Sequence, residues 1–536
     1  MRTHVTDPTG SDRAKPGAAL AVLTAAVLLV SVDATVLLLA LPSISESTGS
    51  SAVQLLWIGD VYSFVLAGLL ISMGALGDRI GHRRLLTAGS AAFGAASLAA
   101  ACSTAPWALI AARAALGVAG AAVMPSTLAL IRAVFPEGDR RAKAVGLWGA
   151  AASAGAALGP VLGGALMQHF WWGSVFVATV PIAAAVALTA RRLLPECRAT
   201  GPAPWDAPSA LLCVVGVLSL VYAVKETAVH GVGGPDVPAA ALTAAVTLRW
   251  FLRRQRTLAT PVLDPELFRD RRFTAAVLTT VVALAGLSGM LFLTAQYLQL
   301  VRGLDPLRAG LADLPGFLGS TLGGLAAAGL VRRTGVRGTL TGCLLLLGCG
   351  LAVFGWVRAD TSYALLATAF LTVGLAEGAV YAAATALALD SAPAGRAGSA
   401  AAVTETAYEL GAAAGIALLG SVLSGVYRAR LTVPPDLAGH AAGQARESLG
   451  QAAETVAGLP AGPARALEEA ARTAFLHGLR TTAVVAALVL LAVAVAVSLM
   501  LPGRSRDAAD RAGVPGPGGP PESGGASPPA ERRSRS

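Results

Sequence analysis

The sequence predicts an all-α, polytopic membrane protein with about fourteen transmembrane helices. Three observations support this fold class. The chain is 55% hydrophobic and 13% charged, whereas an average soluble domain is about a quarter charged. Apolar runs of about 20 residues recur along it, and a helix of that length crosses the roughly 30 Å hydrocarbon core of a bilayer. Lys and Arg concentrate in alternate connections between these runs, as they do in multi-pass membrane proteins.

The predicted transmembrane helices are bounded by Pro, Gly and charged residues. In chain order they cover residues 18–40, 52–75, 85–103, 107–131, 143–167, 173–192, 208–226, 236–252, 274–299, 308–330, 338–357, 363–389, 398–426 and 476–501. The first run follows basic residues, as the apolar region of a secretory signal does. Its length of about 23 residues exceeds the 7 to 15 that are usual there, so an uncleaved helix is predicted.

The chain is predicted to contain two six-helix bundles. Residues 18–192 supply the first bundle and residues 273–501 the second, while residues 193–272 supply two inserted helices and their linkers. A weak internal repeat supports this division, because "GALGDRIGHRR" and "AGLVRRTGVRG" follow the second and tenth helices and align Gly81 with Gly335. Many transporters are built from such repeats, with the substrate site at the interface between them.

The distribution of basic residues predicts the orientation in the membrane. The connections after the second, fourth, sixth, eighth and tenth helices contain Arg79, Arg83, Arg84, Arg132, Arg140, Arg141, Lys143, Arg191, Arg192, Arg198, Arg249, Arg253, Arg254, Arg256, Arg269, Arg271, Arg272, Arg332, Arg333 and Arg337. On the opposite side, the short connections at residues 42–54, 102–107 and 167–174 contain none. Residues 1–17 and 502–536 are therefore predicted to be cytoplasmic, and residues 427–475 to be an external loop with two short helices. The Pro-, Gly- and Ser-rich tail is predicted to be disordered.

Composition and motifs argue against several function classes. The net charge of +10 suggests a nucleic-acid partner, but the position of the basic residues in short loops explains the charge without one. The sequence has no HExxH, GxSxG or P-loop motif and no cluster of His and Cys. A membrane enzyme or sensor is therefore a remote alternative, direct drive by ATP is disfavoured, and no metal or organic cofactor is expected.

One glycine-containing loop resembles a motif of a known family. "GALGDRIGHRR" resembles the cytoplasmic G-x-L-x-D-R-x-G-R/K-R/K motif of the major facilitator superfamily. The matching residues are Gly74, Asp78, Arg79, Gly81 and Arg83. Glycine permits a tight turn, and the charges can form a network that meets helix termini, so a conformational role is implied. His82 departs from the family's Arg or Lys, and an ordinary basic loop is the alternative interpretation.

A second motif lies in the fifth predicted helix. "GAALGPVLGG" resembles the antiporter motif G-x-x-x-G-P-x-x-G-G of the exporting branches of that superfamily. The matching residues are Gly155, Gly159, Pro160, Gly163 and Gly164. Glycines four residues apart create a helix face that another backbone can approach closely, and proline interrupts the helical hydrogen bonds. In the family this motif marks exporters rather than importers.

Ionisable residues inside the predicted helices form the candidate site. They are Asp33, Asp60, Arg113, Glu377, Glu405 and Glu409. Arg113 lies about 10 Å from the helix end, where an unpaired arginine costs about 2.5 to 3.5 kcal/mol, so a carboxylate partner is expected. Asp33 and Asp60 lie at similar depth, so all three are expected to face one cavity. Glu405 and Glu409 share a helix face, and repulsion between like charges there favours protonation of one of them.

Longer stretches resemble one branch of the superfamily. "LLWIGDVYSFVLAG", "MPSTLALIRAVF" and "AAVTETAYELG" resemble the fourteen-helix drug:proton antiporters, and among them the QacA-type quaternary-ammonium resistance proteins, over about residues 18–500. The resemblance implies that acids matching Asp33, Asp60, Glu405 and Glu409 act in proton coupling or cation recognition, and that Arg113 assists proton transfer. The acid that these proteins use for divalent cations falls near Ser320 here, so the resemblance does not extend to divalent cations.

The predicted function is export of lipophilic, cationic drugs or antiseptics by alternating access, coupled to the proton gradient. Candidate aromatic walls for a cation are Trp57, Tyr62, Trp148, Tyr297, Tyr381 and Tyr408, because an aromatic face attracts positive charge. The protein is expected to act as a monomer in the cytoplasmic membrane, with the lipid bilayer, protons and a small-molecule drug as its partners. A dedicated exporter of one antibiotic or secondary metabolite is the alternative.

Overall fold

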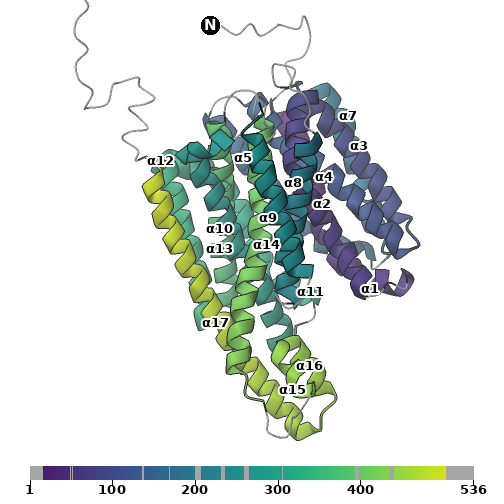
Figure 1. Ribbon diagram of the computed structural model, residues 1–536, viewed down its shortest axis with the longest axis vertical. Helices are drawn as coiled ribbons and strands as arrows, with labels where there is room; N and C mark the ends of the chain where they lie inside the picture. Colours follow the sequence, from purple (N-terminus) through teal and green to yellow (C-terminus); the bar gives the residue numbers. More distant parts are fainter. Residues whose placement is uncertain are drawn as a thin grey trace, which may run out of the picture. The chain divides into compact units, whose positions relative to one another are not determined.

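The computed structural model describes residues 16–48, 50, 52–135, 138–167, 169–198, 207–230, 236–258, 265–304, 306–392, 397–433 and 440–502. The described residues from 16 to 501 form one compact unit, and its described regular elements are all helices (Figure 1). The predicted N-terminal segment up to residue 15 and the predicted tail from residue 503 lie outside the described residues.

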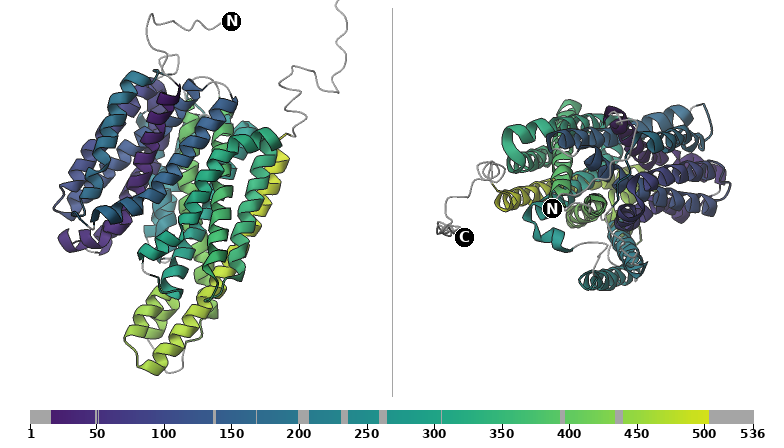
Figure 2. Two further views of the ribbon diagram at one scale, coloured as in Figure 1. Left: turned by 180° about the vertical axis from the view of Figure 1, so that it is seen from behind. Right: turned by 90° about the horizontal axis from the view of Figure 1, so that it is seen from above.

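The first seven helices pack together (Figure 2, purple to blue). They are α1 (Pro16–Thr48), α2 (Ala52–Ile80), α3 (His82–Ala101), α4 (Pro106–Val134), α5 (Gly138–Met167), α6 (Ser174–Val177) and α7 (Thr179–Leu193). Within this group α1 packs against α5, α2 against α4, and α3 against both α4 and α7. Their shared core contains large buried side chains such as Phe93, Trp148 and Phe176.

Two helices follow in the region predicted to hold the insertion. These are α8 (Ala207–His230) and α9 (Asp236–Gln255), which pack against each other. α8 has an apolar stretch at Leu211–Ala223 and also packs against α2 and α14. The pair is therefore attached to both the preceding and the following helices.

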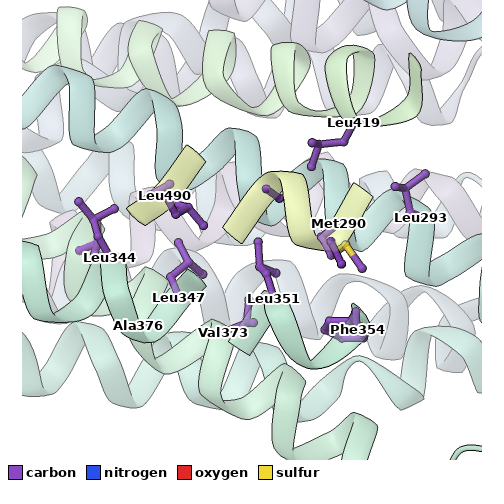
Figure 3. Close-up of a cluster of buried hydrophobic side chains, with 14 of the residues drawn as sticks. Met290, Leu293, Leu344, Leu347, Leu351, Phe354, Val373, Ala376, Leu419 and Leu490 are labelled. Atoms are coloured by element: carbon purple, nitrogen blue, oxygen red, sulfur yellow. The ribbon is translucent and has the colours of Figure 1, made fainter. Parts of the chain in front are cut away.

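The remaining helices form the second group. They are the 3-10 helix η1 (Pro265–Arg269), α10 (Arg271–Gln296) with its π-helical continuation η2 (Tyr297–Val301), α11 (Pro306–Ala312), α12 (Leu314–Val353), the 3-10 helix η3 (Phe354–Trp356), α13 (Tyr363–Ser391), α14 (Ala397–Arg430), α15 (His440–Glu447), α16 (Leu449–Ala457) and α17 (Ala461–Met500). Figure 3 shows part of their core, where Met290, Leu347, Leu351, Val373 and Leu490 meet from α10, α12, α13 and α17.

A bend at Gly335 divides α12 into two parts. This residue has φ 74° and ψ 167°, a left-handed region that glycine adopts without a steric penalty. Gly81, its counterpart in the internal repeat, lies between α2 and α3 and also has a positive φ, of 104°. The two repeat segments therefore share a backbone turn as well as residue types.

The prediction of an all-α, polytopic membrane protein is confirmed. Each of the fourteen predicted ranges coincides with helical residues. Among the described residues, ten stretches are long and apolar enough to cross a membrane, and Arg308–Trp356 contains two predicted helices. The two short helices predicted within residues 427–475 correspond to α15 and α16, which lie with the start of α17 at the lower end of the molecule in Figure 1. The last helix begins at Ala461 rather than near residue 476, because an amphipathic segment continues into the apolar one. The division into bundles stays a prediction.

Candidate functional site

A cavity of about 270 Å³ lies between the two groups of helices. Its lining comes from α1, α2, α4, α5, α10, α12, α13 and α14, and from Asp313 just before α12. The polar lining residues are Ser31, Thr35, Tyr62, Ser63, Ser153, Ser288, Asp313, Ser320, Glu377, Tyr381, Glu405, Tyr408 and Glu409. Four of them are carboxylic acids, whereas no Lys, Arg or His occurs among the described lining residues. The cavity wall therefore favours positive charge.

Glu405 is held in this wall by Tyr381. The Tyr381 hydroxyl donates a hydrogen bond to Glu405 Oε1 at 2.7 Å, and both side chains are buried. Glu409 lies one helical turn further along α14 and also lines the cavity. The two glutamates predicted to share a helix face therefore reach the same cavity.

Aromatic rings form a continuous cluster beside Glu405. The rings of Tyr381 and Tyr408 have centroids 5.0 Å apart, and those of Trp148 and Tyr381 are 5.9 Å apart. Trp148 donates its indole N–H to Thr127 Oγ1 at 3.0 Å and lies behind Tyr381, outside the described lining. The cluster combines a carboxylate with aromatic faces, which is a combination that binds organic cations.

Glu377 belongs to a hydrogen-bonded chain across three helices. Ser320 of α12 donates to Glu377 Oε2 at 2.7 Å, and the Ser320 and Ser153 hydroxyl groups are also 2.7 Å apart. Ser153 comes from α5, so the chain joins the two groups of helices. Ser320 of α12 therefore has a carboxylate from α13 at hydrogen-bonding distance.

Asp33 and Arg113 form a buried ion pair. Arg113 Nη1 lies 2.7 Å from Asp33 Oδ2, and the side chains are 1% and 0% exposed. Arg113 Nε also donates to the carbonyl oxygen of Ile58 at 3.3 Å, and the Arg113 guanidinium carbon lies 4.5 Å from the ring centroid of Tyr62. The arginine thus has the carboxylate partner that its depth requires.

The shared cavity expected for Asp33, Asp60 and Arg113 stays a prediction. Neither Asp33 nor Arg113 is among the described residues of the lining, whereas Tyr62, which the guanidinium contacts, is. Because Tyr62 contacts Arg113 and also lines the cavity, it connects the ion pair to the cavity. The side chain of Asp60, in α2, lies outside the described part.

The other aromatic candidates have different positions. Tyr297 is buried and donates its hydroxyl to the carbonyl oxygen of Arg358 at 2.7 Å, while Trp57 is 41% exposed and packs edge-on to Phe64. Neither is among the described lining residues. Phe317 and Phe370 line the cavity instead. Phe370 precedes Glu377 by seven residues, or about two helical turns, so the two side chains share a face of α13. This spacing is the sequence signal that could have identified Phe370 as a lining residue.

The Gly74–Arg83 motif comprises the end of α2, the turn at Gly81 and the start of α3. It joins the two groups of helices at one end, here called the Gly81 end. Asp78 accepts hydrogen bonds from the backbone N–H groups of Gly398 and Ser399, both at 3.1 Å, in the first turn of α14. A carboxylate at a helix N-terminus is stabilised by the unpaired N–H groups and the helix dipole. A β-carbon on Gly74 would lie 2.6 Å from the Gly398 carbonyl oxygen, so this approach requires glycine.

The charge network of this loop differs from the expected one. Asp78 pairs with His82, whose Nε2 lies 2.9 Å away. Arg83 pairs instead with Glu196 at 3.4 Å, and Arg79 is exposed. The histidine that departs from the family pattern therefore supplies a contact to Asp78.

Further contacts close the Gly81 end. Arg141 of α5 forms an ion pair with Asp390 of α13, and Arg132 of α4 donates to the carbonyl oxygen of Ala392 at 2.6 Å. The cavity lining on α12 and α13, in contrast, reaches back to Asp313 at the start of α12 and to Phe370 in the third turn of α13. These two helices begin at the opposite end. The cavity therefore extends away from the Gly81 end.

The glycines of the second motif lie against α1. A β-carbon on Gly159 would clash with Thr35 Oγ1 and lie 3.0 Å from the Val32 carbonyl oxygen. Gly155 and Gly163 face α1 in the same way, and Thr35 donates to the carbonyl oxygen of Ala156 at 3.1 Å. Gly164 lies in the same helix, as does Pro160, whose side chain is outside the described part. The motif therefore provides the close packing of α5 on the helix that carries Asp33.

An all-helical, multi-pass membrane protein with a polar cavity between two helical groups, closed at one end, has the architecture of a membrane carrier. The model of the Major Facilitator Superfamily matches residues 23–416, and the chain belongs to this family of transporters. The family predicted from the motifs is confirmed.

Known relatives resemble the chain over most of its length. It is 42% identical over 481 residues to the multidrug efflux pump LfrA of Mycolicibacterium smegmatis, covering 90% of this chain and 95% of the relative. It is 38% identical over 489 residues to the methyl viologen resistance protein SmvA of Salmonella typhimurium, covering 90% and 97%. The crystal structure of the human organic anion transporter MFSD10 (TETRAN) has the same fold, with a TM-score of 0.59 at 17% identity, covering 89% of this chain and 99% of that one.

Proposed function

We propose that this protein is a proton-coupled antiporter that exports lipophilic, cationic drugs or antiseptics across the cytoplasmic membrane. The observation that carries the proposal is the charge of the cavity, whose described lining contains four carboxylic acids and no basic residue. The similarity to LfrA, a multidrug efflux pump, and to SmvA, a methyl viologen resistance protein, supports drug export.

Exchange follows from competition for the same carboxylates. A cation in the cavity stabilises the ionised forms of Glu405 and Glu409, whereas a proton removes the charge that holds the cation. Each ligand therefore weakens the binding of the other, and thermodynamic linkage makes the effect reciprocal. The aromatic cluster of Tyr381 and Tyr408 gives the apolar parts of the drug a surface to stack on.

The ion pair in the first group of helices is proposed to complete the coupling. When a proton neutralises Asp33, Arg113 loses its charged partner and keeps its contacts with the carbonyl oxygen of Ile58 and with the ring of Tyr62 at the cavity. A change at the pair is thereby transmitted to the cavity wall. Asp33, Arg113 and Tyr62 are therefore proposed to act together in coupling protonation to the state of the cavity.

The basic loops support the orientation in which the Gly81 end is cytoplasmic. The cavity then opens outward, and the Asp78 contacts with α14, together with the Arg141–Asp390 pair, hold the cytoplasmic side closed. The drug leaves and protons enter in this state. These contacts must separate before the drug can load from the cytoplasm or the inner leaflet.

Purified protein in liposomes tests the proposal. A proton-sensitive dye inside the vesicles reports proton movement when a drug is added, and an antiporter produces drug-stimulated proton flux that disappears when the gradient is collapsed. A membrane sensor or enzyme produces none. A panel of monovalent cations, divalent cations and neutral antibiotics in an efflux-deficient cell then separates broad drug export from export of one antibiotic.

A further inference from the structure

A second cavity lies at the Gly81 end, between α3 and α7. It has a volume of about 360 Å³ and is lined by Arg83, Arg84, Thr87, Ala88 and Arg191. The first four residues come from the first two turns of α3 and the last from the final turn of α7. The transport cycle described above does not use this cavity, so its charged lining needs a separate explanation.

Positive charge exceeds negative charge at this cavity. Glu196 approaches Arg83 at 3.4 Å and Arg84 at 3.6 Å, and it also accepts a hydrogen bond from the Arg83 backbone N–H at 3.1 Å. One carboxylate therefore pairs with two of the three arginines that line the cavity. The side chain of Arg84 is 68% exposed, so it is accessible to another anion.

The outward faces of both helices are apolar beyond the cavity. Exposed residues farther from the cavity include Ala91, Ala95 and Leu98 on α3, and Ala184, Ala185 and Leu188 on α7. In a bilayer such faces contact acyl chains. The arginines lie where these apolar faces end, which is the depth at which lipid headgroups lie.

We propose that this cavity binds the phosphate of an anionic phospholipid, whose acyl chains lie along the outward faces of α3 and α7. A guanidinium group donates two parallel hydrogen bonds to a phosphate, so Arg84 and Arg191 are the proposed ligands. Basic pockets between transmembrane helices recognise anionic headgroups in this way. The apolar faces of α3 and α7 next to the cavity favour a lipid over free phosphate, because free phosphate has no acyl chains to pack against them.

Native mass spectrometry of the full-length protein tests the proposal. Protein in detergent is titrated with phosphatidylglycerol, or with phosphatidylcholine as the zwitterionic reference. One arginine near an anionic headgroup contributes about 1 kcal/mol, so each of Arg84→Gln and Arg191→Gln is expected to lower phosphatidylglycerol affinity about fivefold. The double variant is expected to bind both lipids equally.

Arg192→Gln is the matched control, because Arg192 is exposed on the same last turn of α7 but is not among the described residues of the cavity. It is expected to bind phosphatidylglycerol like the unmodified protein. Equal weakening by Arg192→Gln and Arg191→Gln would overturn the proposal, since general surface charge would then explain binding. Displacement of the lipid by millimolar inorganic phosphate would overturn it in favour of a free-anion site. Size-exclusion elution checks folding, and Arg191→Gln alone suffices if the double variant fails to fold.

Discussion

The two groups of helices each contain buried carboxylates, and among the contacts described above a buried arginine pairs with the acid of the first group. Asp33 of α1 is paired with Arg113 of α4 at 2.7 Å and lies outside the described cavity lining. Glu405 of α14 and Glu377 of α13 line the cavity, and their partners are the hydroxyl groups of Tyr381 and Ser320. A hydroxyl group leaves the negative charge of a carboxylate uncompensated, whereas a guanidinium group neutralises it.

We propose from this difference that the two sites have different tasks. A carboxylate that already has a buried cation gains little from a second one, so the Asp33–Arg113 pair suits proton exchange and the control of conformation. Carboxylates with hydroxyl partners attract a cation from outside, so Glu405 and Glu377 suit substrate binding. Substitutions that remove charge from one site or the other test this assignment.

The largest effect is expected from Arg113→Ala. Removal of one partner leaves the Asp33 charge buried and unpaired, which typically costs about 3 to 5 kcal/mol. Thermal unfolding in detergent is therefore expected at a clearly lower temperature, and drug transport in liposomes should be lost. Asp33→Asn combined with Arg113→Met removes both charges and should restore most of the stability without transport. If Arg113→Ala unfolded at an unchanged temperature, the pair would not be the buried ion pair described here.

Glu405→Gln should abolish transport of cationic drugs with little change in stability. The amide keeps the shape of the side chain and can still bond with the Tyr381 hydroxyl, but it can neither carry negative charge nor exchange a proton. Drug-stimulated proton flux in liposomes is the measurement, with unfolding temperature as the check on the fold. Substantial cation transport by this variant would remove Glu405 from the coupling mechanism.

The fold was more predictable from the sequence than the site. Apolar runs predict helices, because in lipid each run must form its backbone hydrogen bonds within itself. The pairing of Arg113 follows from the free-energy cost of an unpaired charge inside the membrane. Ser320 and Glu377, which form a hydrogen bond, lie 57 residues apart in the chain and in different helices. No local sequence pattern reveals this bond. The same is true of Glu196, which pairs with Arg83 across 113 residues.

Glu377→Gln is expected to affect dications more than monocations. Glu377, Glu405 and Glu409 all line one cavity, so a monocation retains a carboxylate when Glu377 is neutralised, whereas a dication loses one of its two partners. Transport of any dicationic drug that the protein exports should fall about tenfold, which corresponds to about 1.4 kcal/mol, and that of a monovalent dye about twofold or less. Ser320→Ala is the matched control, because it removes the hydroxyl partner and keeps the charge. An equal loss for both substrates would contradict a charge-specific role.

The smallest effect is expected from Tyr381→Phe. This change removes the hydroxyl donor to Glu405 and keeps the ring that contacts Tyr408 and Trp148. A hydrogen bond to a charged group contributes about 1.5 to 3 kcal/mol, but water in the open cavity can replace the donor, so the apparent drug affinity should change by only a fewfold. Tyr297→Phe, which removes a hydroxyl group bonded to Arg358 outside the described cavity lining, should leave drug affinity unchanged. Drug-concentration curves of proton flux measure both. If Tyr381→Phe lost proton flux as completely as Glu405→Gln, the tyrosine itself would take part in proton transfer. This site would then carry protons as well as bind the drug.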